Sequence, residues 1–599
     1  MSANLFCIEC CASLCSRTVG RENQEEAHLT SVDTGSEHAR SKAIEDVEDC
    51  EEHLHTERVD DLQTRNSEEG NLTLIHGHGR SEVEMQQDYP GVYRDKFLGY
   101  PKERVLVSRP SDVQPGWSQE SVCIGLQTDL TTKEEWDGTF DKLVQSNCVK
   151  DLDLDIQLNQ SPEASPDFAK LLECPLSEVS IHVHSRHYSV QIPDSVMTAL
   201  QTKSGLELMT LSESTCSENL ATLLDCHFFP ILRYLALDIS SLDRCIDFSK
   251  IPQLTVLKLS SRYASFEGSL NLDCLPDLKA LDLSIYNCAM GGRKSVCDLG
   301  EERTQLWWLR VHGGTEIRGN LSTVTHLSLN SFFDASDLQQ IVSACSNLTQ
   351  LSVCGARANE LTVPCSVSRL ILTYCDFGCL ELPENETFDV VYLKNVAIAI
   401  VPPRLQATHL CVAFTSDERR HGSLSFVRNL AANPSVLGSP KSLAIIANVS
   451  PSPSDVLYSL MEHATIRKCL EFFATNIPLT RPLLPMSGIR ALCLGRFADI
   501  RYIEALWHCE PLAKLIVLGE QEPTVISLED LRLTQVTESL IVPVDQDIPA
   551  NLGVQVSKSL YRPNHEHAYD RYSPLWAVHV EQETANRLDI DHRDLCLTL

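Results

Sequence analysis

The chain is poor in aromatic residues and has no long apolar run. Phe, Trp and Tyr make up 6% of its 599 residues, and none occurs between Phe6 and Tyr89. No apolar stretch approaches the ~18 residues that a membrane-spanning helix needs. Near the N-terminus Glu9 interrupts a short apolar run, which is untypical of a signal peptide. We therefore expect no membrane span and place the protein in the cytoplasm, a reducing compartment.

Positive charge is also scarce. The chain contains 50 Lys and Arg against 82 Asp and Glu, which gives a formal net charge of −32. Binding to phosphate backbones or to anionic membrane surfaces requires clustered basic residues. The charge therefore excludes nucleic acid as the main partner, and most simply keeps the protein soluble.

Sequence motifs for common catalytic sites are missing. The chain has no phosphate-binding loop, no dinucleotide-binding glycine motif, no zinc-protease helix motif and no nucleophile elbow. We therefore expect no enzymatic activity, no cofactor and no metal site.

Cysteine, by contrast, is frequent, with 24 residues. Most cysteines are scattered among apolar neighbours, a pattern typical of small buried side chains. Cys7, Cys10, Cys11 and Cys15 instead cluster near the N-terminus. This cluster has two alternative interpretations, acylation with peripheral membrane association, or a zinc site that would require four fixed ligands.

The N-terminal region differs in composition from the rest. Residues 21–70 contain 16 Asp or Glu against 5 Lys or Arg. A stretch so rich in one charge cannot bury enough apolar surface to offset chain entropy. We therefore expect residues 1–115 to be largely disordered.

A periodic apolar frame begins downstream of this region. Leu, Val, Ile, Phe or Ala recurs with the spacing L-x-x-L-x-L, and successive frames between 232 and 407 begin 18 to 28 residues apart. The clearest frames begin at Leu232, Leu254, Leu278, Leu306, Val324, Leu348, Val367, Phe388, Ala407, Ile489, Leu512 and Leu528.

This frame resembles the leucine-rich repeat over about 400 residues. Some units resemble the cysteine-containing subtype, because Cys345 and Cys509 stand three residues before Leu348 and Leu512. The resemblance implies an α/β fold, a leucine-rich-repeat solenoid with a curved parallel sheet and with helices or irregular segments on the convex side. We place the solenoid at 116–545 and a C-terminal cap and tail at 546–599.

The resemblance has two departures. The family usually has Asn or Cys three residues after the last Leu of the frame; Cys375 fits, whereas Ala356 and Val396 do not. The turns must therefore close differently. Residues 413–488 are poorly phased with the frame and suggest an insertion or longer helices.

Apolar spacing predicts several helices. We expect helices around Phe140, Leu143 and Val144, from Leu338 to Cys345 with Ser336 or Asp337 as N-cap, from Ser454 to Met461, and from Ile503 to Trp507.

Side chains alternate between the two faces of a strand, so the residues between the frame leucines should point outward on an exposed concave face. Aromatic and Arg residues are enriched among binding hot spots. The candidate partner-binding residues are Tyr234, Trp308, Arg310, His312, His326, Arg369, Tyr392, Lys394 and His409. The alternatives are a solvated strand surface or a face covered by the N-terminal segment. Asp151, Asp153 and Asp155 form a second outward row, interpreted as a solvated acidic face.

These observations favour a monomeric, non-enzymatic scaffold that binds a protein partner on the concave face. One alternative is a substrate-recognition subunit of a ubiquitin ligase, which needs a helical F-box-like module before the array. Another is a secreted microbial effector that binds a host protein through its repeats.

Overall fold

The structure is a computed structural model in which the described residues begin at Val105 and end at Ser559. Within this range it omits 115, 128–132, 158–166, 185–191, 193, 213–222, 224–227, 240–247, 262–268, 286–294, 302–304, 313–314, 331–334, 385, 416–421, 449–453, 478, 495–511, 518–535 and 544–554. The chain divides into two compact units, 1–74 and 75–599. Every described residue belongs to the second unit, so the acylation predicted near the N-terminus and the disorder predicted for residues 1–104 lie outside the described residues. The disorder prediction is wrong for its last residues, because Val105–Val107 form a strand and Pro110–Asp112 form a 3-10 turn.

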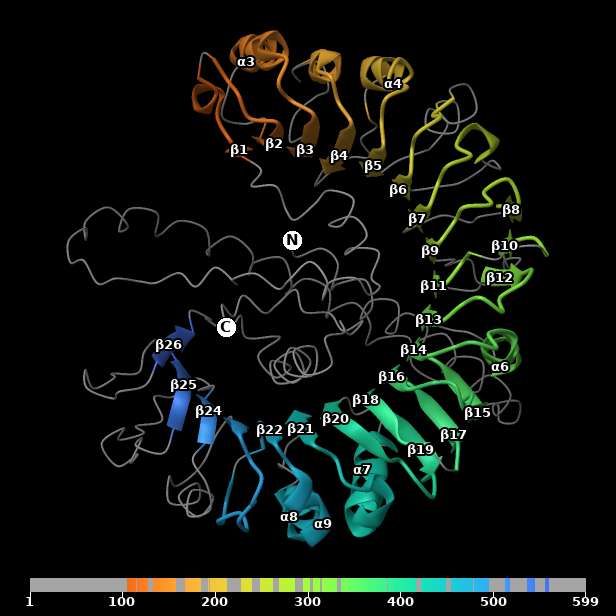
Figure 1. Cartoon of the computed structure of the whole chain (residues 1–599), viewed down its shortest axis with the longest axis vertical. Coiled ribbons are helices and arrows are strands. Elements are labelled where there is room, and N and C mark those ends of the chain that lie inside the picture. The colour runs from red at the N-terminus through yellow and green to blue at the C-terminus, as the bar shows by residue number, and fades with distance from the viewer. Residues whose placement is uncertain are drawn as a thin grey trace, which may run out of the picture. The chain divides into compact units, whose positions relative to one another are not determined.

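The second unit is built on one parallel sheet of 20 described strands (Figure 1). Neighbouring strands follow the order of the chain, apart from the short outer strands. The strands are β1 (Val105–Val107), β2 (Ser121–Gln127), β3 (Asp151–Gln157), β4 (Glu178–His184), β5 (Leu208–Ser212), β6 (Tyr234–Ile239), β7 (Val256–Ser261), β9 (Ala280–Ile285), β11 (Trp308–His312), β13 (His326–Asn330), β14 (Gln350–Cys354), β16 (Arg369–Thr373), β18 (Phe388–Lys394), β20 (Ala407–Thr415), β21 (Ser442–Asn448), β22 (Phe472–Thr475), β23 (Ala491–Leu494), β24 (Leu512–Val517), β25 (Val536–Pro543) and β26 (Gln555–Ser559).

The register of this sheet confirms the periodic frame. Leu327 stands beside Leu351, and Leu351 stands beside Leu370. The matching leucines of earlier strands continue the same row, as Leu281 beside Leu309 illustrates. Every one of the clearest frames except that at Leu528, which lies outside the described residues, therefore contributes one strand to the sheet. This is the arrangement of a solenoid-like α/β fold.

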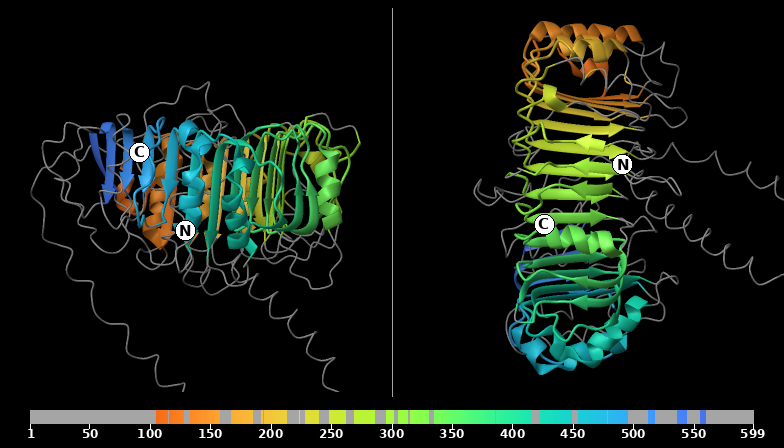
Figure 2. Two further views of the ribbon diagram at one scale, coloured as in Figure 1. Left: turned by 90° about the horizontal axis from the view of Figure 1, so that it is seen from below. Right: turned by 90° about the vertical axis from the view of Figure 1, so that its right-hand side faces the viewer.

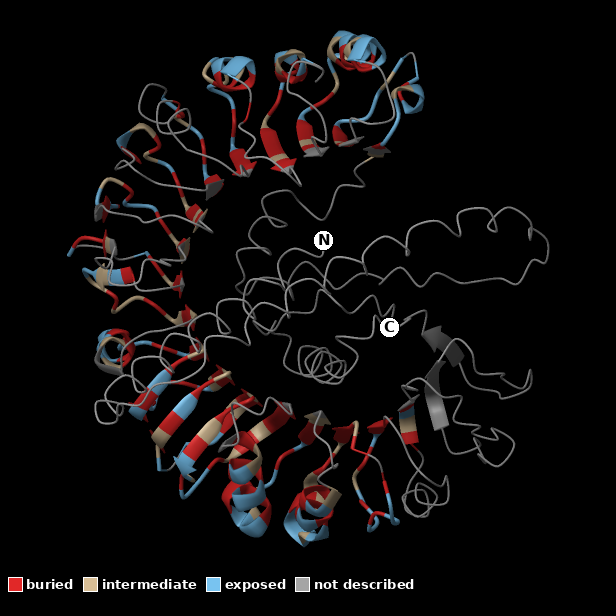
Figure 3. Ribbon diagram, turned by 180° about the vertical axis from the view of Figure 1, so that it is seen from behind, coloured by how far each residue is buried: buried red, intermediate tan, exposed pale blue. Residues whose placement is uncertain are grey.

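The frame residues form the main hydrophobic core. Leu327 and Leu329 point to the same side of β13, and both are buried in the large cluster that runs along the array. Ser328, between them, points to the other side. Figure 3 shows the buried residues following the strands, with exposed residues on the outer layer.

Helices and short strands form that outer layer, on the convex side of the sheet (Figures 1 and 2). The helices are α3 (Lys133–Ser146), α4 (Asp194–Leu200), α6 (Ala335–Ala344), α7 (Gly422–Ala432), α8 (Ser454–Glu462) and α9 (Ala464–Cys469), with 3-10 turns η1 (Pro110–Asp112), η3 (Phe168–Glu173), η4 (Phe248–Lys250) and η6 (Pro434–Leu437). Two parallel outer sheets are made by β8 (Ser269–Asn271), β10 (Ser295–Asp298) and β12 (Thr315–Arg318), and by β15 (Arg357–Thr362), β17 (Asp376–Glu381) and β19 (Ala397–Ile400).

A side-chain amide from α6 closes one edge of the second outer sheet. Gln339 Oε1 accepts a hydrogen bond from the backbone N–H of Thr362 at 2.9 Å, and Gln339 Nε2 donates to the Thr362 carbonyl at 3.4 Å. The amide thus satisfies both backbone groups of Thr362, the last residue of this edge strand.

The turns after three successive strands close through a left-handed residue. Gly355, Tyr374 and Asn395 follow β14, β16 and β18 with positive φ angles of 75°, 55° and 52°. Each backbone N–H donates to a carbonyl of the next repeat, at 2.8, 2.7 and 2.7 Å respectively. The three turns therefore close alike, although only the turn before Cys375 has the cysteine of the family pattern.

The structure confirms three of the predicted helices, α3, α6 and α8. It corrects the predicted N-cap of α6, because the helix begins at Ala335 and so includes Ser336 and Asp337. The helix predicted at 503–507 lies outside the described residues. Within 413–488, α7, α8 and α9 alternate with β21 and β22, so longer outer segments separate strands that keep the ladder. The sheet itself extends beyond 116–545 at both ends, to β1 and β26.

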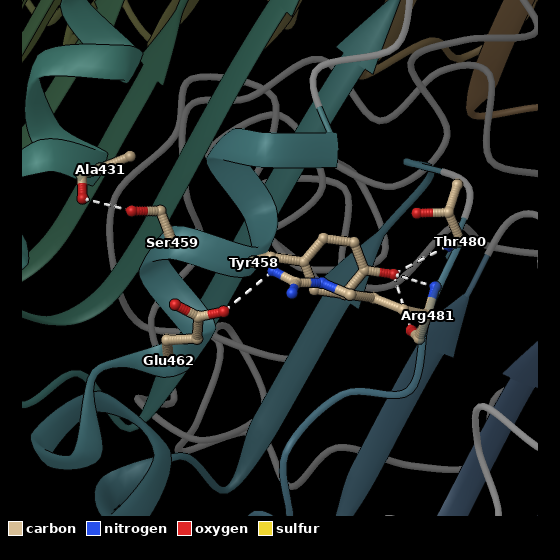
Figure 4. A network of polar contacts seen from close by, with 6 residues as sticks. All are labelled: Ala431, Tyr458, Ser459, Glu462, Thr480 and Arg481. Atoms are coloured by element: carbon tan, nitrogen blue, oxygen red, sulfur yellow. Dashed lines mark hydrogen bonds and ion pairs between the residues drawn. The ribbon is translucent and has the colours of Figure 1, made fainter.

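A tyrosine fixes the outer connection between β22 and β23 (Figure 4). The Tyr458 hydroxyl donates to the Arg481 carbonyl at 2.7 Å and accepts from the backbone N–H groups of Thr480 and Arg481, both at 2.8 Å. The Arg481 guanidinium lies over the Tyr458 ring and pairs with Glu462 at 2.9 Å. This network joins α8 to the connection between β22 and β23, and its role is structural.

Two general properties concern the described residues alone. None of their helices is both long and apolar enough to cross a membrane. Their cysteines are free thiols rather than disulfides.

Candidate partner-binding face

The sheet register places the candidate residues on the face opposite the main core. Tyr234, Trp308, His326, Arg369 and His409 occupy one transverse row, at the first outward position of their strands. Arg310 and Tyr392 occupy the second row, two residues further along each strand. Lys394 belongs to the third row, together with His312, whose side chain is outside the described set.

Two groups of candidates come together on neighbouring strands. Trp308 stands beside His326, and Arg310 shares the strand of Trp308. Beyond β14, the second group comprises Arg369, Tyr392, Lys394 and His409 on β16, β18 and β20. Tyr234 lies apart from both groups, because β7 and β9 separate its strand from β11.

The expectation of an exposed face is wrong for the large candidate side chains. The exposed fractions of Tyr234, Trp308, Tyr392 and His409 are 4%, 2%, 2% and 5%. One physical reason is lateral packing, since outward side chains of adjacent parallel strands lie about 4.8 Å apart. A second hydrophobic cluster, separate from the main core, consists of Leu208, Tyr234, Ala236, Val256, Ala280 and Trp308.

Arg310 is held between an aromatic ring and a carboxylate. Its guanidinium carbon lies 5.4 Å from the centroid of the Trp308 ring, and its Nη1 lies 3.8 Å from Asp282 Oδ2 on β9. The Arg310 side chain remains 17% exposed. A planar cation that stacks on an aromatic ring in this way keeps its donors oriented for a carboxylate.

Trp307 and His326 extend this first group towards the N-terminal ends of β11 and β13. The Trp307 and His326 rings meet edge to face, with centroids 5.5 Å apart. His326 Nδ1 lies 2.9 Å from the Thr325 hydroxyl. Both rings are half-buried, so they remain accessible at the border of the group.

The second group contains two polar anchors. Arg369 Nε lies 3.6 Å from Asp389 Oδ2, and His409 Nδ1 lies 3.0 Å from the Ser442 hydroxyl in a buried contact. Lys394 Nζ lies 5.8 Å from the centroid of the Tyr374 ring, beside the left-handed turn. These contacts fix the cations in defined positions.

The same face changes character along the array. At the N-terminal end, Asp151 and Glu178 are buried neighbours, and Asp153 lies 3.8 Å from His182 Nε2. The Asp155 side chain is outside the described residues. Asp151 and Asp153 were predicted as a solvated acidic face, and the burial of Asp151 corrects that expectation. Among the residues that the structure describes, no three His, Cys, Asp or Glu lie together as metal ligands would.

At the C-terminal end the face is apolar. We define the concave apolar zone as Val390, Tyr392, Cys411, Ala444, Phe472 and Cys493. These residues occupy the first two outward rows of β18 to β23, and the exposed fraction of none exceeds 3%. Arg310, His326 and Arg369 therefore stand between two apolar regions of one face.

Sequence reasoning missed two partners of the candidates, Asp282 and Ser442. A usable signal was present for the first, because the frame at Leu278 places Asp282 outward one strand before Arg310. Ser442 lies in the poorly phased stretch, where the frame alone could not assign a row.

The described face offers arginine, lysine and histidine side chains beside aromatic rings. No model of a known protein family matches the chain, and no curated protein is similar to it at a significant level.

Proposed function

We propose that the chain is a leucine-rich-repeat solenoid that acts as a non-enzymatic scaffold and binds a protein partner on its concave face. The L-x-x-L-x-L frame and its strict register support the repeat assignment. The binding proposal is carried by one observation, the stacking of Arg310 on Trp308 next to His326.

The partner would contact the accessible parts of the two groups. Arg310, His326 and Lys394 are half-buried, whereas Trp308 and Tyr392 are buried. Arg310 lies over the Trp308 ring, and Lys394 lies near the Tyr374 ring. Central arginines supported by aromatic rings are typical binding hot spots. A partner surface with carboxylates would complement the cations of Arg310 and Lys394, which stand in an otherwise acidic chain.

The test compares three forms of the full chain by affinity capture and then by direct binding of the purified partner. The double variant Arg310→Glu, Lys394→Glu reverses the charge on the concave face. The control Arg357→Glu makes the same change at an exposed position of the outer strand β15.

We expect the double variant to weaken binding at least 10-fold and the control to bind as the unchanged chain does. Equal affinity of the double variant and the unchanged chain would refute the proposal. The described residues between 105 and 150 contain the single helix α3, and no observation there favours an F-box-like module.

A further inference from the structure

The concave apolar zone is buried although it faces away from the main core. Its side chains alternate with core residues such as Leu410 and Leu443, which belong to the main cluster. Cys411 and Ala444 stand beside each other on the opposite face and do not belong to that cluster. The packing of the main core therefore cannot explain their burial.

The neighbouring helices do not cover this zone either. α7 and α8 bury Phe426, Val427, Val456 and Leu457 in the main cluster, on the convex side of the sheet. The described helices therefore add no cover to the concave apolar zone. Cys411 stands between the small Ala444 and the large Tyr392 on the two adjacent strands, so lateral packing contributes to its burial.

We propose that residues 560–599 of the same chain dock on the concave apolar zone. Their point of attachment favours this segment. Residue 560 follows β26, which lies seven strands from β18 and three from β23 in the sheet order. At about 4.8 Å per strand the span to β18 is roughly 34 Å, whereas 40 extended residues reach ~130 Å.

The chain that precedes β1 would have to travel further. β1 lies twelve strands from β18 on the other side, a span of roughly 58 Å. The shorter closure costs less chain entropy.

The composition of the segment complements the zone. Residues 575–580 read Leu-Trp-Ala-Val-His-Val, an apolar run with a large aromatic ring. Residues 581–594 contain five acids and two arginines. The apolar run fits the small and apolar side chains of the zone, and the acids fit Arg369 and Lys394 at its border.

Native cysteines provide a direct readout. Cys411 and Cys493 belong to the concave apolar zone, whereas Cys345 and Cys375 belong to the main core. Burial also raises the pKa of the Cys493 thiol. Removal of a concave cover should expose the first pair to an alkylating reagent and leave the second pair protected.

The experiment measures alkylation of these four thiols in the full chain by peptide mass spectrometry. In the variant Trp576→Asp, Val578→Asp, we expect alkylation of Cys411 and Cys493 to accelerate at least 10-fold, with Cys345 and Cys375 unchanged. The matched variant Tyr93→Asp, Phe97→Asp alters the aromatic stretch before β1 and should change none of the four rates. Unchanged protection in the first variant, or exposure of Cys411 and Cys493 in the second, overturns the proposal.

A cross-link decides the case in which the first variant unfolds and all four thiols react. Ala577→Cys adds a thiol beside Trp576, and a short bifunctional maleimide should join it to Cys411 or Cys493. A link from position 577 to other cysteines but to neither of these would overturn the proposal. Both readouts are independent of the proposed protein partner, so the failure of one proposal does not decide the other.

Discussion

The two faces of the main sheet differ in how much their chemistry varies along the array. On the core face, Leu, Val, Ile, Met and Phe occupy almost every first and second inward position from β2 to β24. On the concave face, the outward positions pass from acidic to apolar, then to basic and aromatic, and then again to apolar. The repeat frame therefore fixes the type of residue on the core face. The type of residue on the concave face changes every few strands.

The difference follows from what each face must do. A core residue packs against the equivalent residue of the next repeat, so any change that breaks apolar contact weakens two interfaces. Concave residues also pack against their neighbours, as Tyr234, Val256 and Ala280 do, but the repeat frame does not fix their residue type. The identity of concave residues is therefore free to reflect whatever binds or covers that face.

The sharpest test of this difference is a pair of adjacent substitutions on β13. Leu329→Asp places a carboxylate in the main core, and we expect it to lower the free energy of unfolding by at least about 4 kcal/mol and to unfold neighbouring repeats. Asn330→Asp, one residue away and half-buried on the concave face, should cost less than about 1 kcal/mol.

Urea denaturation followed by circular dichroism measures both variants. Similar losses of stability in the two variants would contradict the separation of the faces.

The sequence predicted the rows of the core face well, because the frame repeats many times and each copy supports the others. It predicted α6 from Leu338, Ile341, Val342 and Cys345, which share one helical face. It could not predict the outer parallel sheets, because inward residues such as Ala358 and Leu361 stand three apart rather than two. Such spacing lacks the alternation by which strands are recognised.

The candidate site was predictable in position but not in exposure. The alternation of residues placed Trp308, Arg310 and Tyr392 on the correct face. Their burial depends on packing between strands and on segments far away in the sequence, and no local pattern reports either. The left-handed turns at Tyr374 and Asn395 were unpredictable for a related reason, since their conformation is fixed by hydrogen bonds to the next repeat.

Two core thiols should make the core face sensitive to alkali. Burial raises the pKa of Cys345 and of Cys375 from 9.0 to about 12. Above pH 9 the unfolded chain loses these protons while the folded chain keeps them, so stability present below pH 9 is lost as the pH rises towards 12. Each thiol should lower the free energy of unfolding by about 1.4 kcal/mol per pH unit within this window.

The measurement is urea denaturation at several values between pH 8 and 10.5, with the double variant Cys345→Ala, Cys375→Ala as comparison. The variant is less stable at pH 8, because two buried side chains become smaller. Its stability should nevertheless fall less steeply with pH. Parallel pH profiles would show that the two thiols ionise as readily in the folded chain as in the unfolded one.

The smallest expected effect concerns the turns where the chain leaves the strand for the outer layer. Gly355 has a φ of 75°, and its N–H donates to the Thr373 carbonyl at 2.8 Å. Gly355→Ala should lower the free energy of unfolding by about 1 kcal/mol, because an added Cβ is strained in the left-handed region. Gly138 lies in the exposed interior of α3, with no atom within 4 Å of an added Cβ. Gly138→Ala should therefore raise stability by about 1 kcal/mol, and thermal unfolding that shifts both variants in the same direction would contradict the assignment of the turn.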